Sequence, residues 1–346
     1  MLIQHSPLEI IRIAHVAAPA RSTPRRSKCV SSRVVSRDAP ILSRRCGLVR
    51  LMISSSRGSK SRKMPAPLTN SMNDGPPFAP AEKRFEFGEN WSRFLNVLDD
   101  ERIAQAKSAL EKMLGADSLA GKSFLDVGSG SGLFSLAARS LGARVHSFDF
   151  DRRSYQCTLE LKRRYFPDDE NWTVEQGSIL DPSLVARLGK FEIVYSWGVL
   201  HHTGRMWDAM DNTASLVSSG GTLFIAIYND QGWISGWWKQ VKNLYCSGAA
   251  GRWLVKCAFY PYFVLSGFGA DLIHQRNPIR RYTEYKKRRG MSAIHDWVDW
   301  LGGNPFEVAR PEEVIHFAIA RGFQLRRLKT CGGRLGCNEF VFLLGT

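Results

Sequence analysis

The sequence predicts an α/β protein with a doubly wound, mostly parallel seven-stranded sheet and a helical, aromatic-rich insertion after the fifth strand. Three observations lead to this fold class. Short apolar strands alternate with helical runs over residues 123–228. The first of these strands ends in a glycine-rich turn that opens a helix. Near the carboxyl terminus, a helical run is followed by two adjacent apolar strands.

The elements are expected in the following order. Ahead of the sheet, apolar residues recur at helical spacing from Phe87 to Leu98, and a second helix follows over about 101–114. The five parallel strands are expected at 123–127, 144–149, 172–175, 191–196 and 221–228. The helices between them are expected at 133–141, 152–165, 183–188 and 206–216. The chain closes with a helix at 312–320 and strands at 324–330 and 339–344. Strictly alternating strands and helices imply a parallel sheet with helices on both faces.

Residues 1–65 form a separate basic segment. They hold 14 Lys and Arg against two acids, a net charge of +12 out of +16 for the chain. The segment is rich in Ser and Arg and lacks a sustained apolar period, so it cannot bury enough apolar surface to offset its ordering entropy. Three interpretations stay open: a disordered arm, an organelle transit peptide, or the product of a start codon placed upstream of Met64 or Met72.

The rest of the chain divides into a core with an N-terminal helical cap (85–228), an inserted lid or substrate region (229–308) and the last core elements (309–346). Its charge of only +4 disfavours nucleic acid as a partner. The seven cysteines are odd in number, scattered and without a CxxC pair. They indicate a reducing, cytoplasmic compartment and no metal site.

The most informative motif is the turn after the first strand, Asp126-Val127-Gly128-Ser129-Gly130-Ser131-Gly132. Its alternating glycines let the backbone turn tightly against a ligand, and the following helix offers free N–H groups. A dinucleotide fingerprint, G-x-G-x-x-G, would need its third glycine where Leu133 stands. The acid at the end of the strand would also repel a pyrophosphate, whereas a sulfonium-bearing amino acid is tolerated there.

This turn resembles motif I of the class I S-adenosylmethionine methyltransferases, and the resemblance extends over about residues 85–346. In that family an acid at the end of the second strand grips both ribose hydroxyls. Asp149 has this place, with Asp151 as the alternative. Many family members carry Asp where Ser178 stands, which makes the adenine contact there less specific. The resemblance implies an S-adenosyl-L-methionine site formed by Asp126, Gly128, Ser129, Gly130, Gly132, Asp149, Phe150, Ser178, Ile179, Trp197 and Gly198.

The doublet His201-His202 follows the fourth strand, at the edge where a methyl acceptor would lie. One of the two could act as a base for a phenolic hydroxyl. The alternative is that one histidine packs at the start of the next helix and the other faces water. The Asn/Asp-Pro-Pro-Tyr/Phe loop of amino-methylating enzymes is not found here, because Ser196-Trp197-Gly198-Val199 stands in its place.

The insertion contains six of the ten tryptophans, and residues 257–270 carry no charge. Fourteen residues are too few to span a bilayer, which needs about 20. Lysines and arginines flank the run on both sides, which suits peripheral contact with an anionic membrane surface. The alternative is a lid packed on its own domain with a solvated basic edge.

Residues 291–307 and 330–339 are dense in polar and aromatic groups and are candidate walls of the acceptor pocket. These stretches resemble those of bacterial methyltransferases that are similar to the ubiquinone-biosynthesis O-methyltransferases. We therefore expect methyl transfer to a small or amphipathic acceptor, with a quinone-like or lipid-like aromatic hydroxyl as the leading hypothesis. An RNA methyltransferase that uses the basic strip 276–289, and a non-catalytic scaffold, are the alternatives.

Overall fold

The computed structural model describes residues 85, 87–96, 98–273 and 293–346, and all of them belong to one compact unit. The predicted N-terminal segment 1–65 and the basic strip 276–289 lie outside the described residues.

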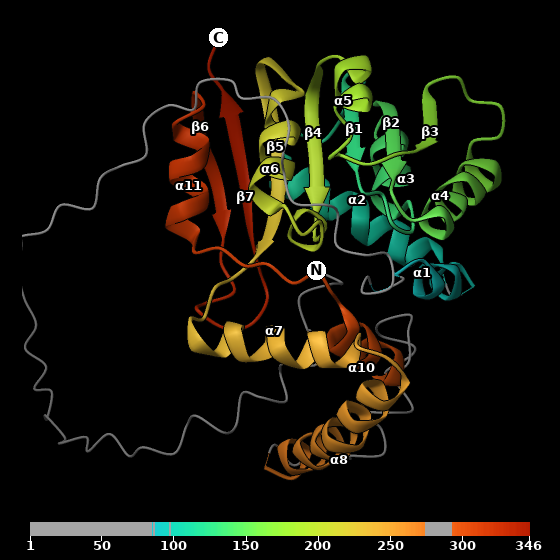
Figure 1. Ribbon diagram of the computed structural model, residues 1–346. Helices are drawn as coiled ribbons and strands as arrows, with labels where there is room; N and C mark the ends of the chain where they lie inside the picture. The colour runs from blue at the N-terminus through green and yellow to red at the C-terminus, as the bar shows by residue number, and fades with distance from the viewer. Residues whose placement is uncertain (1–84, 86, 97, 274–292) are drawn as a thin grey trace, which may run out of the picture. The chain divides into compact units, whose positions relative to one another are not determined.

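The sheet has seven strands in the order β3-β2-β1-β4-β5-β7-β6 (Figure 1). β1 to β5 pair in parallel, whereas β7 lies antiparallel between β5 and β6. The strands are β1 (Ser123–Val127), β2 (Arg144–Asp149), β3 (Trp172–Gln176), β4 (Phe191–Trp197), β5 (Val217–Tyr228), β6 (Phe323–Lys329) and β7 (Cys337–Leu344). The order reverses beside β1, so a crevice for a ligand is expected at the carboxyl ends of β1 and β4.

Helices precede, connect and follow the strands. The helices are α1 (Gly88–Leu95), α2 (Asp100–Leu114), α3 (Leu133–Ser140), α4 (Arg152–Tyr165), α5 (Pro182–Leu188), the short 3₁₀ helix η3 (Leu200–His202), α6 (Met206–Ser215), α7 (Trp233–Tyr245), α8 (Ala249–Ile273), α10 (Ala293–Gly302) and α11 (Pro311–Ile319).

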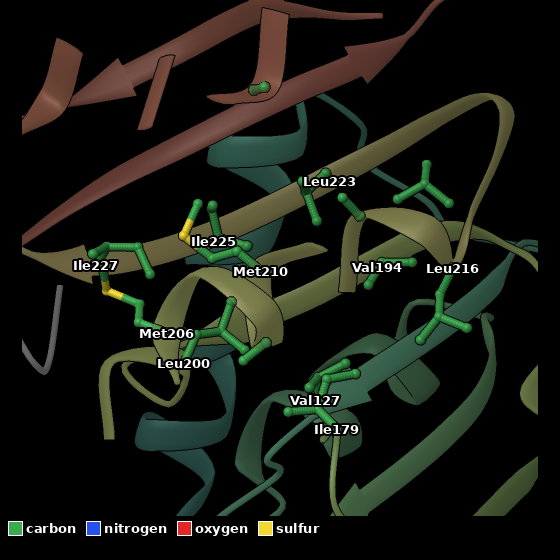
Figure 2. Close-up of a cluster of buried hydrophobic side chains, with 14 of the residues drawn as sticks. Val127, Ile179, Val194, Leu200, Met206, Met210, Leu216, Leu223, Ile225 and Ile227 are labelled. Carbon is green, nitrogen blue, oxygen red and sulfur yellow. The ribbon is translucent and has the colours of Figure 1, made fainter. Parts of the chain in front are cut away.

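Two hydrophobic clusters cover the two faces of the sheet, because successive strand residues point to opposite sides. On one face, Leu125 and Val194 pack against α5, α6 and α11. Figure 2 shows Val194 in this cluster with Met206 and Met210 of α6. On the other face, Phe124 and Tyr195 pack against α1 to α4. Both clusters are almost fully buried, so they fix the strand ends from which the ligand-facing loops project.

The observed fold confirms the predicted fold class, and the last two strands form an antiparallel hairpin at the far edge of the sheet. Most predicted bounds lie within one residue of the observed ones. The largest difference is at β5, which begins at Val217 rather than residue 221, because Val217 already pairs with Phe191 ahead of a register shift in β4.

The insertion consists of α7, α8 and α10 and has a hydrophobic cluster of its own around Trp238, Phe263 and Trp300. Tyr228, the last residue of β5, packs against this cluster. Figure 1 shows the three helices beyond the carboxyl ends of the parallel strands. Within the described residues, no helix is both long enough and apolar enough to cross a membrane.

Candidate functional site

The turn between β1 and α3 is held in a conformation that favours glycine. Gly128 and Gly130 have φ angles of 77° and 57°, in the left-handed region. A Cβ added at Gly128 would lie 2.4 Å from Val199 Cγ1, and one at Gly130 would lie 3.2 Å from the Trp91 indole. Gly128 is therefore enclosed by the loop after β4, and Gly130 is covered by α1.

The neighbouring residues of the turn anchor it to α4. Ser129 Oγ and Thr158 Oγ1 are hydrogen-bonded at 2.9 Å. Gly132, the last glycine, precedes α3 with a φ of 80°, and a Cβ there would lie 2.8 Å from Thr158 Cα. The turn is thus fitted closely between α3 and α4, with its glycines where larger residues would not fit.

Asp149 ends β2 and holds the same turn through its carboxylate. Its Oδ2 accepts a 2.8 Å hydrogen bond from Gly130 N–H, and its Oδ1 accepts one of 2.8 Å from Asp151 N–H. Burial raises the pKa of Asp149 to about 6, although these two hydrogen bonds act against the rise. Asp151, the alternative residue, instead caps α4 by accepting from Arg153 N–H and Ser154 N–H.

Asp126 lies inside the fold, 2% exposed, and faces α3. Its carboxylate accepts from Ser135 Oγ–H, which in turn accepts from Ser147 Oγ–H, and Ser147 accepts from Trp172 Nε1–H. Burial raises the pKa of Asp126 to about 7. The structure therefore shows a carboxylate that ties β1 to α3, and a direct contact of Asp126 with a cofactor stays a prediction.

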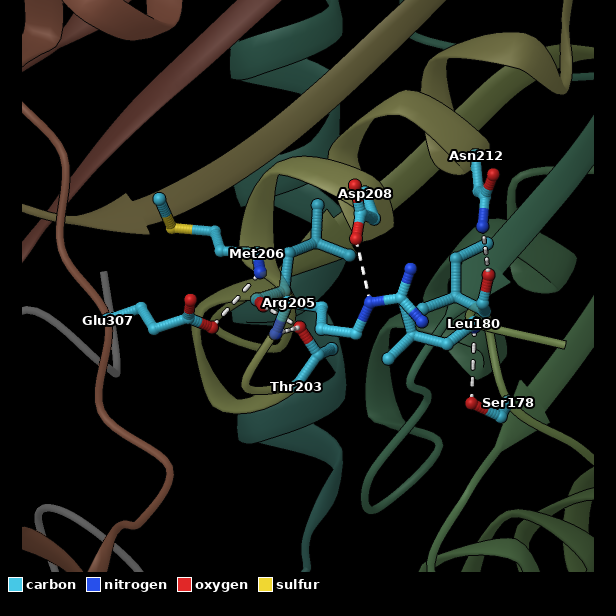
Figure 3. A network of polar contacts seen from close by, with 10 residues as sticks. Ser178, Leu180, Thr203, Arg205, Met206, Asp208, Asn212 and Glu307 are labelled. Atoms are coloured by element: carbon cyan, nitrogen blue, oxygen red, sulfur yellow. Dashed lines mark hydrogen bonds and ion pairs between the residues drawn. The ribbon is translucent and has the colours of Figure 1, made fainter. Parts of the chain in front are cut away.

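The residues expected around adenine lie in different environments. Phe150, next to Asp149, is a large apolar side chain that is 55% exposed. Ser178 Oγ accepts from Leu180 N–H within its own turn (Figure 3). The Ile179 side chain is only 4% exposed and packs in the hydrophobic core, so Ile179 could offer a ligand only its backbone.

The end of β4 leaves room beside its backbone. Gly198 has a φ of 74°, and a Cβ added there would meet no atom within 4 Å. Trp197 is partly buried against the cluster on the α1–α4 face. Gly198 is therefore a place where a ligand can approach the backbone closely.

The two histidines of η3 have different hydrogen-bond partners. His201 is fully buried, and its Nδ1 accepts from Tyr228 N–H at 3.3 Å. His202 Nδ1 lies 2.7 Å from the Pro305 carbonyl oxygen, to which it must donate. Burial, assisted by the positive charge of Lys242, holds the pKa of His201 well below its usual value and lowers that of His202 to about 3. Both rings are therefore neutral at physiological pH.

Glu307 holds the loop after the histidines in place. Its backbone N–H donates to the His201 carbonyl at 3.0 Å, and its carboxylate accepts from Met206 N–H at the start of α6. Figure 3 shows this cap beside Thr203 and Arg205. The last residues of the insertion thus fix both η3 and α6.

Sequence reasoning missed a group of residues around the histidines. The Tyr228 ring centroid lies 3.9 Å from that of His201 and 6.0 Å from that of Trp300. Lys242, on α7, is 1% exposed, and its Nζ lies 4.3 Å from the Trp300 ring centroid. In the sequence, Lys242 is one of the basic residues that flank the apolar run 257–270. No local pattern links it to Trp300, which lies about 60 positions further along the chain.

The structure therefore places the predicted residues in two groups. The turn glycines, Asp149 and Phe150 gather at the ends of β1 and β2. His201 and His202 gather with Tyr228 at the ends of β4 and β5. Val199 joins the two groups, because its side chain lies over Gly128.

A family model described as a methyltransferase domain matches residues 98–276, just over half of the chain. The chain belongs to the methyltransferase domain family. This confirms the prediction of a class I S-adenosylmethionine-dependent methyltransferase, in agreement with the observed strand order. No curated protein matches the sequence of this methyltransferase.

Two solved structures are similar to the methyltransferase at low identity. Magnesium protoporphyrin IX methyltransferase from Synechocystis, with bound SAM, is 12% identical over 80% of this chain and 100% of that chain, with a TM-score of 0.45. Burkholderia thailandensis 1,6-didemethyltoxoflavin-N1-methyltransferase is 15% identical over 79% of this chain and 94% of that chain, with a TM-score of 0.43. At these scores, neither similarity bears on the acceptor.

Proposed function

We propose that this methyltransferase binds S-adenosyl-L-methionine along the carboxyl ends of β1, β2 and β4 and methylates a small or amphipathic acceptor, with an aromatic hydroxyl as the leading candidate. The observation that carries the cofactor site is the partly buried Asp149 carboxylate, hydrogen-bonded to Gly130 N–H at the glycine turn. This hydrogen bond places a carboxylate directly beside a glycine turn whose backbone a ligand can approach closely.

Asp149 is proposed to accept hydrogen bonds from both ribose hydroxyls. An ionised carboxylate is an acceptor with two oxygens, and hydrogen bonds to a charged group are about 1.5–3 kcal/mol each. The pKa of about 6 sets the pH dependence. Protonation converts one acceptor oxygen into a donor, so cofactor affinity is expected to fall as the pH drops below about 6.

We assign the adenine and methionine parts of the cofactor to neighbouring residues. The exposed Phe150 ring offers a flat apolar surface to adenine, with Ser178 and the Ile179 backbone at the adjacent strand end. The methionine part is proposed to lie by Gly198 and Trp197, where the backbone is open.

His202 is the better candidate of the two histidines for contact with the acceptor. Because its Nδ1 donates to the Pro305 carbonyl, its Nε2 carries a lone pair and can accept from an acceptor hydroxyl. Methyl transfer is an in-line displacement that depends mainly on positioning. We assign His202 to orient the hydroxyl and to accept its proton as the oxygen becomes positively charged.

Contact with an anionic membrane surface is proposed for α8. Its exposed side chains from Cys257 to Ile273 are apolar, with Leu265 69% exposed and Ile273 64% exposed. Arg252 and Lys256 precede this surface, and further basic residues follow it in the sequence. An apolar helix face flanked by cations suits the interface of an anionic bilayer.

The lipid proposal is tested by co-sedimentation with phosphatidylglycerol-containing vesicles. Leu265→Asp is expected to abolish sedimentation, whereas Ile319→Asp, at a 56% exposed position of α11, is expected to leave it unchanged. Equal sedimentation of both variants and the wild type would overturn the proposal. So would self-association of the wild type through α8, detected by ultracentrifugation and lost in Leu265→Asp.

The cofactor site is tested by calorimetry with S-adenosylhomocysteine. Asp149→Asn keeps an acceptor for Gly130 N–H but removes the charge, and affinity is expected to fall at least tenfold. Asp151→Asn, two residues away, removes the same charge but keeps the cap of α4, and affinity is expected to change less than twofold. Equal affinities for the two variants would contradict the assignment of Asp149.

Binding measurements on the wild-type protein also distinguish the two alternative functions. Absence of any binding by folded wild type would favour the non-catalytic scaffold. An RNA complex whose affinity falls steeply with salt concentration, as expected when several counterions are released, would favour the RNA methyltransferase.

A further inference from the structure

Two buried N–H donors lie where the insertion meets the strand ends. The ring nitrogens His201 Nε2 and Trp300 Nε1 are both buried, and neither has a hydrogen-bond partner among the residues that the structure describes. His201 is 0% exposed and Trp300 is 6% exposed. Buried polar groups in proteins are paired with few exceptions, and an unpaired one points to a ligand or an ordered water.

The hydrogen-bond pattern fixes His201 as a donor at this place. Its Nδ1 accepts from Tyr228 N–H, so in the neutral ring the proton resides on Nε2. The Trp300 indole nitrogen is a donor in every state. Both groups can therefore only give hydrogen bonds, and both require an acceptor atom.

The two donors border one aromatic ring. The Tyr228 ring lies 3.9 Å from the His201 ring and 6.0 Å from the Trp300 ring, measured between centroids. Phe306 adds a further wall at 5.4 Å from Tyr228. This aromatic group also adjoins His202, whose ring centroid lies 5.4 Å from that of Tyr228.

Lys242 gives this region a positive charge. Its Nζ donates to the Trp300 carbonyl and lies over the Trp300 and Phe306 rings, at 4.3 and 4.9 Å from their centroids. It acts electrostatically on both His201 and His202.

We propose that His201 Nε2–H, Trp300 Nε1–H and the charge of Lys242 form a binding site for an acidic oxygen, a carboxylate or an ionised hydroxyl, on an aromatic methyl acceptor. The inference rests on the proposed function, and it narrows the acceptor from aromatic molecules in general to those that carry an anionic oxygen. His201 and Trp300 would bind this group, and His202 would remain beside the reacting hydroxyl.

The test uses nitrogen-15 labelled tryptophan in the full chain with S-adenosylhomocysteine present. The indole N–H signal of Trp300 is identified by its loss in Trp300→Phe, which keeps an aromatic ring. Benzoate is the carboxylate probe, 4-nitrophenol at pH 8 is the ionised hydroxyl probe, and benzyl alcohol is the neutral one. A saturable shift of the Trp300 signal is expected with at least one anion and not with benzyl alcohol.

Trp238→Phe is the matched control, because Trp238 is a buried tryptophan of the same cluster whose N–H is not among the unpartnered groups. By calorimetry, Trp300→Phe is expected to weaken binding of the anion about tenfold and Trp238→Phe less than threefold. The inference is overturned if no anion shifts the signal, if benzyl alcohol shifts it equally, or if the two variants behave alike. S-adenosylhomocysteine binding in the same samples separates this failure from that of the proposed function.

Discussion

Asp126→Asn is expected to make the protein more stable, and more so at pH 8 than at pH 5. Burial raises the pKa of Asp126 from 3.8 to about 7, so between these values the folded protein keeps a proton that the unfolded chain releases. The stability of the wild type therefore falls as the pH rises through this window. A pKa difference of about three, at about 1.4 kcal/mol per pKa unit, lowers the free energy of unfolding by about 4 kcal/mol in total.

Roughly 2–3 kcal/mol of this loss falls between pH 5 and pH 8. Asn cannot ionise, and its amide oxygen can still accept from Ser135 Oγ–H. The stability gap between the variant and the wild type should therefore widen by about 2–3 kcal/mol from pH 5 to pH 8. Urea unfolding followed by circular dichroism measures the gap at both values. A gap that stays constant, or narrows toward pH 8, would refute the reasoning.

Three further predictions concern the site. Gly130→Ala should weaken S-adenosylhomocysteine binding at least tenfold in calorimetry, because the added Cβ would meet Trp91. Gly121→Ala is the control: its backbone is also left-handed, but no atom lies within 4 Å of the added Cβ, so binding should not change. Phe150→Ala should leave the melting temperature unchanged, since the ring is exposed, and weaken binding about three- to tenfold. Glu307→Ala should lower the free energy of unfolding by about 1 kcal/mol in urea through loss of the α6 cap, and Glu307→Gln should restore most of it.

The core of the fold follows from the sequence because its signals are local. The alternation of apolar strands with helical runs needs only neighbouring residues, and it locates β1, β2 and α4 with the bounds that the structure shows. The glycine turn is equally local, since its positive φ angles are available to few residues other than glycine. Asp149 follows from its place at the end of β2 alone.

The acceptor side could not be read in this way, because its contacts join distant segments. Trp300 and Lys242 meet through packing of α10 on α7, and no local pattern indicates that a lysine in a basic stretch is buried. The sequence presents His201 and His202 as an equivalent doublet. Only their hydrogen-bond partners distinguish them. His201 Nδ1 accepts from Tyr228 N–H, so its Nε2 is a donor, whereas His202 Nδ1 donates to the Pro305 carbonyl, so its Nε2 is an acceptor.

The structure of the complex with S-adenosylhomocysteine tests the central claim most directly. The account predicts both ribose hydroxyls within hydrogen-bond distance of the Asp149 carboxylate, adenine against the Phe150 ring, and the homocysteine part beside Gly198. Density for the ligand away from the glycine turn, or a ribose held by residues other than Asp149, would contradict it.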